Sequence, residues 1–485
     1  MDANTILRIK PELTRFLHQF DDCFGRITTR RYLDLYIEGQ LSDLPRKSLE
    51  PMADYFEEPP RNLQQFLSLF RWDETAVRDG LQQQVARRHS HPHSVGVFDE
   101  TSFVKKGDQT ACVQRQHCGT VGKVENCVVS VHLGYATPEF HTLLDGELFL
   151  PEETWHANRA RCREVGIPDE VIYRPKWQIA LGQYRRAVAN GVRFSWLTFD
   201  EYYGRSGPLL RELDGFGQNF VAEVPVNFTA WTQRPAVLYR DYARNKKRGR
   251  KKQYPRLKVK NNPRVEVRNI LRYSPVMTQQ EWQTYHVKDG TKGPMVWQAK
   301  RIRVYLADAN GLPTRAHHLL VARNALNPPE IKYFISNAPE DTPVEILLRV
   351  AFTRWTIERA FEDSKGELGM DHFEVRQFLS IQRHLILSCL SHVFLSEFCL
   401  KYRGKKSRLD RLPGTNGDFA SGGLVGTGRP LFPQVSPKDQ CAIVINATAQ
   451  CQGGTQPSAT YNQTITCYRH YIKKHNQMSL VSFVA

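Results

Sequence analysis

The feature that most constrains the fold is a run of apolar residues, VRFSWLTF, which occupies residues 192–199 and is followed by Asp200. A nearly continuous apolar run of this length suits a central β-strand that is buried on both faces. An amphipathic helix is predicted just before it, over Lys176–Ala189, and the pair Asn190-Gly191 is a C-cap signal. Another short strand is predicted over residues 220–226. This order of elements favours an α/β core.

Several shorter strands are predicted before this run. The segments are SVGVF, which leads into Asp99, TACVQRQ from Thr110, VVSVHLGYA from Val128 and FHTLLDGELFL from Phe140. Each is bounded by glycine, proline or charged residues that are typical of turns. Consecutive short strands of this kind predict an antiparallel meander. We therefore assign residues 91–227 to the first part of the core.

The first 90 residues have a different pattern. Their apolar residues recur with helical spacing over segments 6–20, 29–38, 62–70 and 75–88, and prolines separate the segments. They contain 13 basic and 14 acidic residues, so they carry almost no net charge. We expect an all-α domain over residues 1–90.

Most of the chain's net charge of +17 comes from one region. Residues 240–305 contain 19 Lys or Arg against 4 Asp or Glu. Such a region binds a polyanion by displacing counterions, without reading sequence, although a solvated loop or a targeting-like tract is the alternative. Aromatic residues such as Trp282 and Trp297 lie within it and favour nucleic acid, because their rings can stack on bases. We expect residues 228–341 to form a basic, β-rich insertion.

The core is expected to resume at a helix start. Thr342 is the predicted N-cap, Pro343 the first helical residue and Glu345 the third, which together form a capping box. This helix is predicted to continue through residue 368, and a second apolar helix over residues 377–402. Residues 342–402 are thus the second part of the core. Residues 403–485 are rich in Gly, Ser, Thr and Pro, which predicts a flexible tail.

Three carboxylates are candidates for a metal site. Asp99 and Asp200 follow predicted strands, and Glu358 lies on the helix after the insertion. Divalent Mg²⁺ or Mn²⁺ prefers oxygen ligands, and two such ions can act on both the attacking and the leaving oxygen of a phosphodiester. At 100° per residue, Arg354 and Lys365 share the helix face of Glu358, where cations could hold phosphates.

Other interpretations of this helix stay open. The face could be an ordinary exposed ion-pair face, and Glu362, one turn further on, is a rival ligand. Glu100 and Glu201 are adjacent to the two aspartates, and the alternation of side chains along a strand predicts that they point to the opposite side.

The segments around these carboxylates carry a family resemblance. The segment AFTRWTIERAFEDSK has the Arg, Glu and Lys of a Tyr-x2-Arg-x3-Glu-x6-Lys signature, with Ala351 in place of the Tyr. The segments VFDETSFVKKG around Asp99, LTFDEYYG around Asp200 and VQRQHCGTVGKVEN are also similar to the family. At these segments the chain resembles the bacterial insertion-sequence transposases of the DDE type. The resemblance spans roughly residues 20–400.

This resemblance implies an α/β RNase H-like catalytic core with an inserted β-rich domain and an all-α N-terminal domain that recognises DNA. It implies cleavage at the terminal inverted repeats and joining of the freed 3′-hydroxyl to target DNA, with Asp99, Asp200 and Glu358 holding two Mg²⁺. It also implies a homodimer on DNA. Some relatives flip a base onto a Trp of the insertion. The DNA-binding candidates are Arg354, Lys365, Lys105, Lys106, Lys246, Lys247, Arg248, Arg250, Lys251, Lys252 and Trp297.

The sequence predicts neither a membrane protein nor a secreted protein. No apolar run reaches the roughly 20 residues of a membrane span, and the first 16 residues carry charges where a signal peptide has an apolar centre. The ten cysteines lack the spacing of a disulfide framework. We therefore expect a cytoplasmic, nucleoid-associated protein. The alternatives to a transposase are an RNase H-like nuclease without strand transfer and a non-catalytic repressor derived from a transposase.

Overall fold

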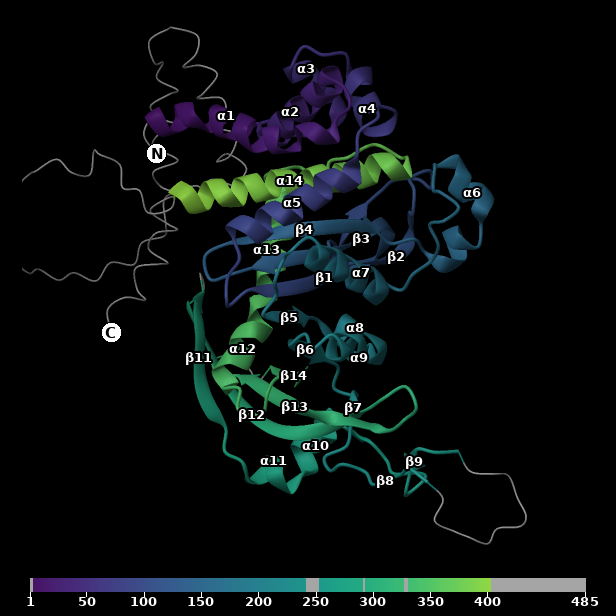
Figure 1. Ribbon diagram of the computed structural model, residues 1–485, viewed down its shortest axis with the longest axis vertical. Helices are drawn as coiled ribbons and strands as arrows, with labels where there is room; N and C mark the ends of the chain where they lie inside the picture. Colours follow the sequence, from purple (N-terminus) through teal and green to yellow (C-terminus); the bar gives the residue numbers. More distant parts are fainter. Residues whose placement is uncertain (1–2, 241–252, 291–292, 327–329, 403–485) are drawn as a thin grey trace, which may run out of the picture. The chain divides into compact units, whose positions relative to one another are not determined.

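The computed structural model describes residues 3–240, 253–290, 293–326 and 330–402 (Figure 1). The chain divides into two compact units. One, the helical unit, combines Met1–Gly80 with the segment from Glu362 onward. The other, the sheet unit, is Leu81–Phe361. The predicted domain boundaries at residues 90, 227, 341 and 402 remain predictions.

The sheet unit contains a mixed sheet of ten strands (Figure 1). Their order is β11-β12-β13-β14-β6-β5-β1-β3-β2, and β4 also pairs with β3. The strands are β1 Val95–Val104, β2 Gln114–Cys118, β3 Lys123–Ala136, β4 His141–Leu148, β5 Trp196–Phe199, β6 Phe220–Val224, β11 Gln283–Gly290, β12 Gly293–Ala307, β13 Pro313–Asn324 and β14 Ile331–Ser336. Four short strands pair outside it: β7 Thr229–Ala230 with β10 Val265–Glu266, and β8 Val237–Leu238 with β9 Arg256–Leu257.

The apolar run forms the centre of this sheet, as predicted. β5 is parallel to β1 on one side and to β6 on the other. The consecutive residues Leu197, Thr198 and Phe199 are each at most 1% exposed. Because successive side chains of a strand point to opposite faces, both faces of β5 are covered. The strand begins at Trp196, so it is shorter than the predicted run of residues 192–199.

Several helices accompany the sheet. They are α6 Arg159–Glu164, α7 Lys176–Ala189, α8 Glu201–Gly204, α9 Gly207–Gly215, α10 Val267–Tyr273, α11 Pro275–Gln279 and α12 Val344–Thr353, with a wide turn at Glu152–His156. The bounds of α7 are those predicted. Its C-cap is Asn190, and Gly191 has a φ of +89°, a conformation that glycine adopts without strain. The sequence signal at Asn190-Gly191 is therefore confirmed.

The pairs formed among β1, β2, β3 and β4 are antiparallel, as predicted, but the predicted meander order is wrong. β3 lies between β1 on one side and β2 and β4 on the other, with β2 along its first part and β4 along its second. β2 also begins only at Gln114, not at Thr110. A strand of 14 residues is long enough to pair with two strands along one side, which a pattern of local turns does not predict.

Residues 228–341 are rich in β-structure, but their long strands do not form a separate sheet. β14 pairs antiparallel with β6, so β11 to β14 extend the sheet that contains β1 and β5. The structure therefore describes a mixed α/β unit with one large sheet, and an independent inserted domain is not confirmed.

The helix expected after this region differs in two ways from the prediction. α12 begins at Val344, its N-cap position is Pro343, and no side chain caps it, so the capping box on Thr342 is wrong. The predicted continuous helix is also divided: α12 ends at Thr353, and α13, Trp355–Gly366, begins after Arg354. The amide N–H of Ile357 donates to the Arg354 carbonyl at 3.1 Å, a tighter i→i+3 bond.

The helical unit contains the predicted N-terminal helices and the long C-terminal one. Its elements are α1 Ala3–Leu17, a 3₁₀ turn His18–Cys23, α2 Ile27–Leu41, α3 Leu49–Tyr55, α4 Pro60–Ser68 and α14 Phe378–Tyr402, while α5 Glu74–Arg88 and α13 are shared with the sheet unit. α3 was not predicted. α14 is long and apolar enough to cross a membrane, yet 67% of its most apolar window is buried in the structure, as in the core helix that the sequence predicts.

Candidate active site

Asp99 and Asp200 lie side by side at one edge of the sheet. The parallel register pairs Phe98 on β1 with Phe199 on β5, and each aspartate is the next residue. β1 itself continues to Val104, so the expectation that the first strand ends at Asp99 is wrong; only its pairing with β5 ends there. The parallel pairing of β1 with β5 thus brings the two carboxylates together at the point where that pairing ends.

Each aspartate is also held by backbone N–H groups. The Asp200 carboxylate accepts hydrogen bonds from the amides of Tyr202 at 3.0 Å and Tyr203 at 3.3 Å, which makes it the N-cap of α8. The Asp99 carboxylate accepts one from the amide of Glu100 at 2.8 Å. These contacts fix the position of both carboxylates.

Burial and nearby negative charge raise the pKa values of both aspartates. Burial, and then the negative charge of Asp200, raise the pKa of Asp99 to about 8, against the lowering effect of Arg354. Burial, and then the charge of Glu100, raise the pKa of Asp200. Like charges that are close together and poorly solvated favour protonation. The site therefore carries more negative charge than its surroundings balance.

Arg354 joins the third candidate carboxylate to this pair. One of its guanidinium nitrogens, Nη1, lies 2.9 Å from the Glu358 carboxylate and 3.6 Å from the Asp99 carboxylate. Its Nε lies 3.9 Å from Glu223 on β6. Burial acts to lower the pKa of Arg354, but the surrounding carboxylates, Glu358 first, raise it. The spacing of four residues between Arg354 and Glu358 thus gives the predicted contact.

The donor atoms fit a divalent cation that prefers oxygen. Asp99, Asp200 and Glu358 offer carboxylate oxygens, the ligand type of Mg²⁺ and Mn²⁺, and their excess negative charge favours a cation. Within the described residues no three His, Cys, Asp or Glu side chains form a ready cluster for a metal ion. The Glu358 side chain is 44% exposed and is engaged by Arg354, so it must change partner to join the two aspartates.

Two further acidic residues of the site were not predicted. Glu223 is 8% exposed and pairs with Lys332 at 2.7 Å. Glu100, expected to point to the opposite side, pairs with Lys176 at 2.5 Å and accepts a hydrogen bond from the Tyr203 hydroxyl at 2.8 Å. The alternating pattern of β1 gave no signal for these contacts of Glu100, because Lys176 and Tyr203 lie far along the chain from it.

Gly204 explains how α8 can approach the sheet so closely. A Cβ atom at this position would lie 1.8 Å from the backbone oxygen of Glu223, a distance too short for any residue other than glycine. The last residue of α8 therefore has to be glycine for Asp200 and Glu223 to lie on neighbouring elements.

The other DNA-binding candidates lie elsewhere. Lys105 and Lys106 follow the end of β1, about 20 Å along the strand from Asp99 at 3.4 Å per residue. Lys365 lies at the end of α13 that belongs to the helical unit, as does the rival ligand Glu362, so their places beside Glu358 remain predictions. The basic residues Lys246, Lys247, Arg248, Arg250, Lys251 and Lys252 lie outside the described residues.

The aromatic candidates differ in exposure. Trp297 is 5% exposed and its ring lies 4.6 Å from that of Phe352, so its burial does not suit a stacking surface. Trp282 is covered by the guanidinium of Arg323 at 4.3 Å. Trp355, which the sequence analysis did not single out, is 49% exposed and directly follows Arg354.

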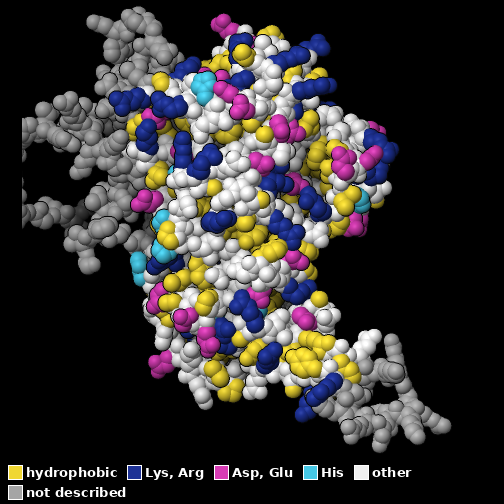
Figure 2. All heavy atoms as spheres, in the orientation of Figure 1, with side chains coloured by type: hydrophobic (Ala, Val, Ile, Leu, Met, Phe, Trp, Pro, Cys, Tyr) yellow, Lys and Arg dark blue, Asp and Glu magenta, His cyan; other side chains and the backbone are white. Residues whose placement is uncertain are grey.

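The surface of the described residues is not uniformly basic. On the face drawn in Figure 2, Lys and Arg side chains alternate with Asp and Glu. Of the densest basic segment, residues 244–260, residues 244–252 lie outside the described residues. The electrostatic case for DNA binding by that segment therefore rests on its sequence.

Two comparisons with known proteins find similar sequences. A family model described as "DDE superfamily endonuclease" matches residues 19–294, which include Asp99 and Asp200 but not Glu358. A probable transposase for insertion sequence element IS701 from Microchaete diplosiphon is 27% identical over 191 residues. That match covers 39% of this chain and 47% of the relative, so the chain spans about half the length of the curated relative it matches.

Proposed function

The chain belongs to the DDE superfamily of endonucleases, and from this premise we propose that it is an insertion-sequence DNA transposase. It cleaves the DNA at the element's ends and joins the freed 3′-hydroxyl to target DNA, in an RNase H-like core. The observation that carries the proposal is that Asp99 and Asp200 lie side by side at one sheet edge, with Arg354 pairing with both Asp99 and Glu358. The similarity to a probable transposase supports it.

The proposed roles follow from the local contacts. Asp99 and Asp200, fixed by backbone N–H groups, hold the divalent cations, and Glu358 completes the ligand set. Two Mg²⁺ ions, or Mn²⁺ in their place, would activate the attacking oxygen and stabilise the leaving one. Arg354 orients Glu358 and Asp99, and its charge faces the non-bridging oxygens of the scissile phosphate. Burial of the aspartates strengthens these interactions, because charges interact more strongly away from water.

The remaining parts of the proposal rest on the family and on composition. The N-terminal helices recognise the terminal inverted repeats, and the basic segment with Lys246 to Lys252 contacts phosphates without reading sequence. The protein acts as a homodimer, since two ends have to be joined, and it is located in the cytoplasm on the nucleoid. Lys105, Lys106 and Lys365 add contacts to the DNA backbone.

The test is cleavage of a DNA fragment that spans the element's own end, with Mg²⁺, by the wild type and by Asp99→Ala, Asp200→Ala and Glu358→Ala. We expect the wild type to cut at the end, and each variant to bind the fragment but cut it at least about a hundredfold more slowly. Incubation with a target plasmid then distinguishes a transposase, which joins the 3′ end, from a nuclease, which does not.

Two outcomes would contradict the assignment. Undiminished cutting by Glu358→Ala would remove Glu358 from the ligand set and make Glu362 the residue to test next. Binding of the end by the wild type without cutting would favour the repressor.

A further inference from the structure

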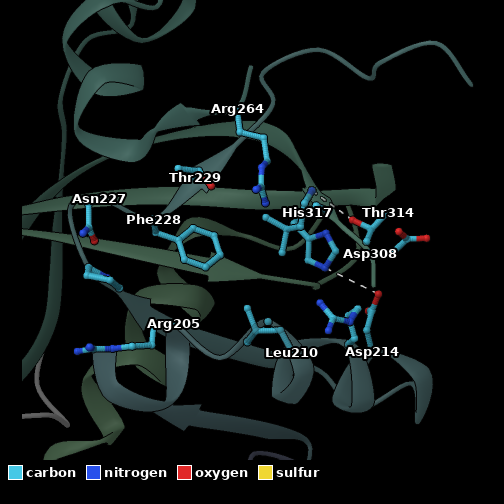
Figure 3. A pocket seen from close by; sticks show the side chains of 15 residues that line it. Arg205, Leu210, Asp214, Asn227, Phe228, Thr229, Arg264, Asp308, Thr314 and His317 are labelled. Atoms are coloured by element: carbon cyan, nitrogen blue, oxygen red, sulfur yellow. Dashed lines mark hydrogen bonds and ion pairs between the residues drawn. The ribbon is translucent and has the colours of Figure 1, made fainter. Parts of the chain in front are cut away.

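A second site lies near the carboxylates. An open cavity of about 410 Å³ is lined by the end of α8, by α9, by the segment after β6 and by the turn between β12 and β13 (Figure 3). This volume is within the range of small-ligand pockets. β5 and β6 are parallel, so the residues after β6 leave the sheet at the edge where Asp200 follows β5. The cavity therefore opens on the same edge of the sheet as the candidate active site.

Three arginines line this cavity, and none has a carboxylate partner among the described residues. Arg205 donates from Nε to the backbone oxygen of Glu201 at 3.3 Å. The guanidinium of Arg264 lies 5.8 Å from the ring centre of Trp231. Arg211 lies so close to Gly207 that a Cβ there would be 3.0 Å from its Nη1. Unpaired guanidinium groups around a cavity attract an anion, and their planar geometry suits phosphate.

The acidic residues of the cavity do not cancel this charge. Asp214 is already paired with Arg315 at 2.5 Å and accepts a hydrogen bond from Asn337 at 3.1 Å, contacts that lower its pKa. Its other oxygen lies 3.8 Å from the buried His317 (Figure 3). Asp308 accepts hydrogen bonds from the amides of Asn310 and Leu312, both at 2.8 Å. The cavity thus keeps an excess of positive charge.

The centre of the cavity offers an aromatic face. Figure 3 shows the ring of Phe228 in the middle, with Arg264 reaching down toward it and Leu210 below. Arg205 lies at the side away from His317 and Asp308. A planar ring can therefore lie against Phe228 while an attached phosphate meets Arg264 and Arg211. The combination of an apolar ring face with unpaired guanidinium groups is the chemistry that binds a nucleotide.

We propose that this cavity binds one nucleotide of the DNA strand on which the carboxylates act, with the base on Phe228 and the phosphates on Arg264, Arg211 and Arg205. The inference rests on the proposed function. Arg205 is five residues beyond Asp200 along α8, a distance of about 7–8 Å at 1.5 Å per residue. This distance corresponds to about two steps of the axial rise of a duplex, which is about 3.4 Å per nucleotide of a strand. A strand whose phosphate lies at Asp99 and Asp200 reaches the cavity a few nucleotides away.

The experiment compares the full chain with three variants: Arg211→Ala/Arg264→Ala, Phe228→Leu and Arg193→Ala. Arg193 is the matched control, because it is exposed, has no ion-pair partner among the described residues and precedes β5, at the opposite edge of the sheet from Asp200. Binding of a labelled duplex of the element's end is measured by fluorescence anisotropy in EDTA over a range of salt concentrations. Competition with dAMP and with inorganic phosphate is measured in parallel.

We expect the double arginine variant to bind the duplex at least about tenfold more weakly, with a shallower salt dependence, because two phosphate contacts are lost. Phe228→Leu should weaken binding about fivefold or more without changing the salt slope. Arg193→Ala should match the wild type. Circular dichroism of each variant checks that it is folded.

Two results would overturn the proposal. Duplex binding by all variants at the wild-type level would show that DNA does not enter the cavity. Competition by dAMP that the double variant abolishes, with duplex binding unchanged, would make the ligand a free nucleotide instead. Because binding is measured without metal, a wild type that fails to cut DNA would contradict the proposed function and leave this measurement valid.

Discussion

Arg354 in the sheet unit and Arg383 in the helical unit are both largely buried, but their partners differ. Arg354 is surrounded by the carboxylates of Glu358, Asp99 and Glu223. Arg383, whose side chain is 5% exposed, pairs with one carboxylate and otherwise donates to backbone carbonyls. Those partners are Glu74 and the carbonyl oxygens of Phe66, Leu67, Phe70 and Trp72.

The two surroundings have opposite effects on the pKa values of the two arginines. The carboxylates around Arg354 raise its pKa, whereas burial lowers the pKa of Arg383 against the effect of Glu74. Arg383 satisfies carbonyls in the last turn of α4 and in the segment after it, and has no excess of negative charge beside it, so its contacts stabilise α14 against these residues. Arg354 has more acidic partners than it can neutralise. This difference distinguishes an arginine that stabilises the fold from an arginine in a site whose excess negative charge favours binding of further cations.

The largest expected effect is on stability, in the helical unit. Arg383→Met should lower the free energy of unfolding by about 3–5 kcal/mol, because four carbonyl oxygens and Glu74 lose their donor together. Urea unfolding followed by circular dichroism measures it. Lys10→Met is the control, since the Lys10 side chain is 53% exposed in its 3.4 Å pair with Glu38, and should cost less than about 1 kcal/mol. Equal losses in the free energy of unfolding for the two variants would contradict a structural role for Arg383.

The next effect is on catalysis, in the sheet unit. Arg354→Gln should lower the rate of end cleavage about 10²–10³-fold, because a positioned cation facing developing charge is lost. Arg349→Gln is the control, since Arg349 is exposed on α12 and has no ion-pair partner among the described residues. Single-turnover cleavage of the element's end measures both. Similar rates for the two variants would contradict the distinction between Arg354 and an ordinary surface arginine.

A smaller effect tests the charge imbalance itself. The pKa of Asp99 is about 8 in the folded protein and about 3.9 when unfolded. The folded state therefore binds the proton more tightly, and stability is lost as the pH rises from about 4 to 8. Asp99→Asn removes this loss, so in EDTA it should stabilise the protein by at least about 1 kcal/mol at pH 8, and less at pH 5.

Asp214→Asn is the matched comparison for this pH experiment. Ion pairing with Arg315 and hydrogen bonding lower the pKa of Asp214, so its contribution is present at neutral pH and lost as the pH falls. The variant should be less stable than the wild type at pH 8, the opposite sign from Asp99→Asn. Thermal unfolding at pH 5 and pH 8 measures all three proteins. The same sign for both variants at pH 8 would refute the proposed charge imbalance.

The smallest effect concerns the single carboxylate of Arg383. Glu74 is 32% exposed, and its replacement leaves the four carbonyl contacts of Arg383 intact. Glu74→Gln should therefore cost no more than about 1 kcal/mol in urea unfolding. A cost near that of Arg383→Met would mean that the ion pair, rather than the carbonyls, stabilises this part of the helical unit.

Local signals in the sequence predicted individual elements well. α7 has the predicted bounds, α14 begins one residue after its predicted start, and the apolar run is the central strand. The contact between Arg354 and Glu358 follows from their spacing on a helix. These features depend on residues within one or two turns of each other, so periodicity and caps are enough to predict them.

The errors arise where distant segments meet. The order of β1 to β4 and the continuation of the sheet into β11–β14 depend on strand pairing, and the position of Glu223 beside Arg354 depends on the packing of a helix end against β6; all three join residues far apart in the chain. The helix start at Val344 and the break at Arg354 also differ from the prediction.

The sequence by itself determined the two candidate aspartates after predicted strands, the glutamate with its arginine one turn before it, and the family resemblance around them. Only the tertiary structure decided that Asp99 and Asp200 share a register, that Arg354 joins Asp99 to Glu358, and that Trp297 is buried. The physical reason is that local pattern sets the type of an element, whereas sheet pairing and burial set which elements become neighbours. The charge imbalance of the site is a property of those neighbours, because it arises from buried groups that lie far apart in the sequence.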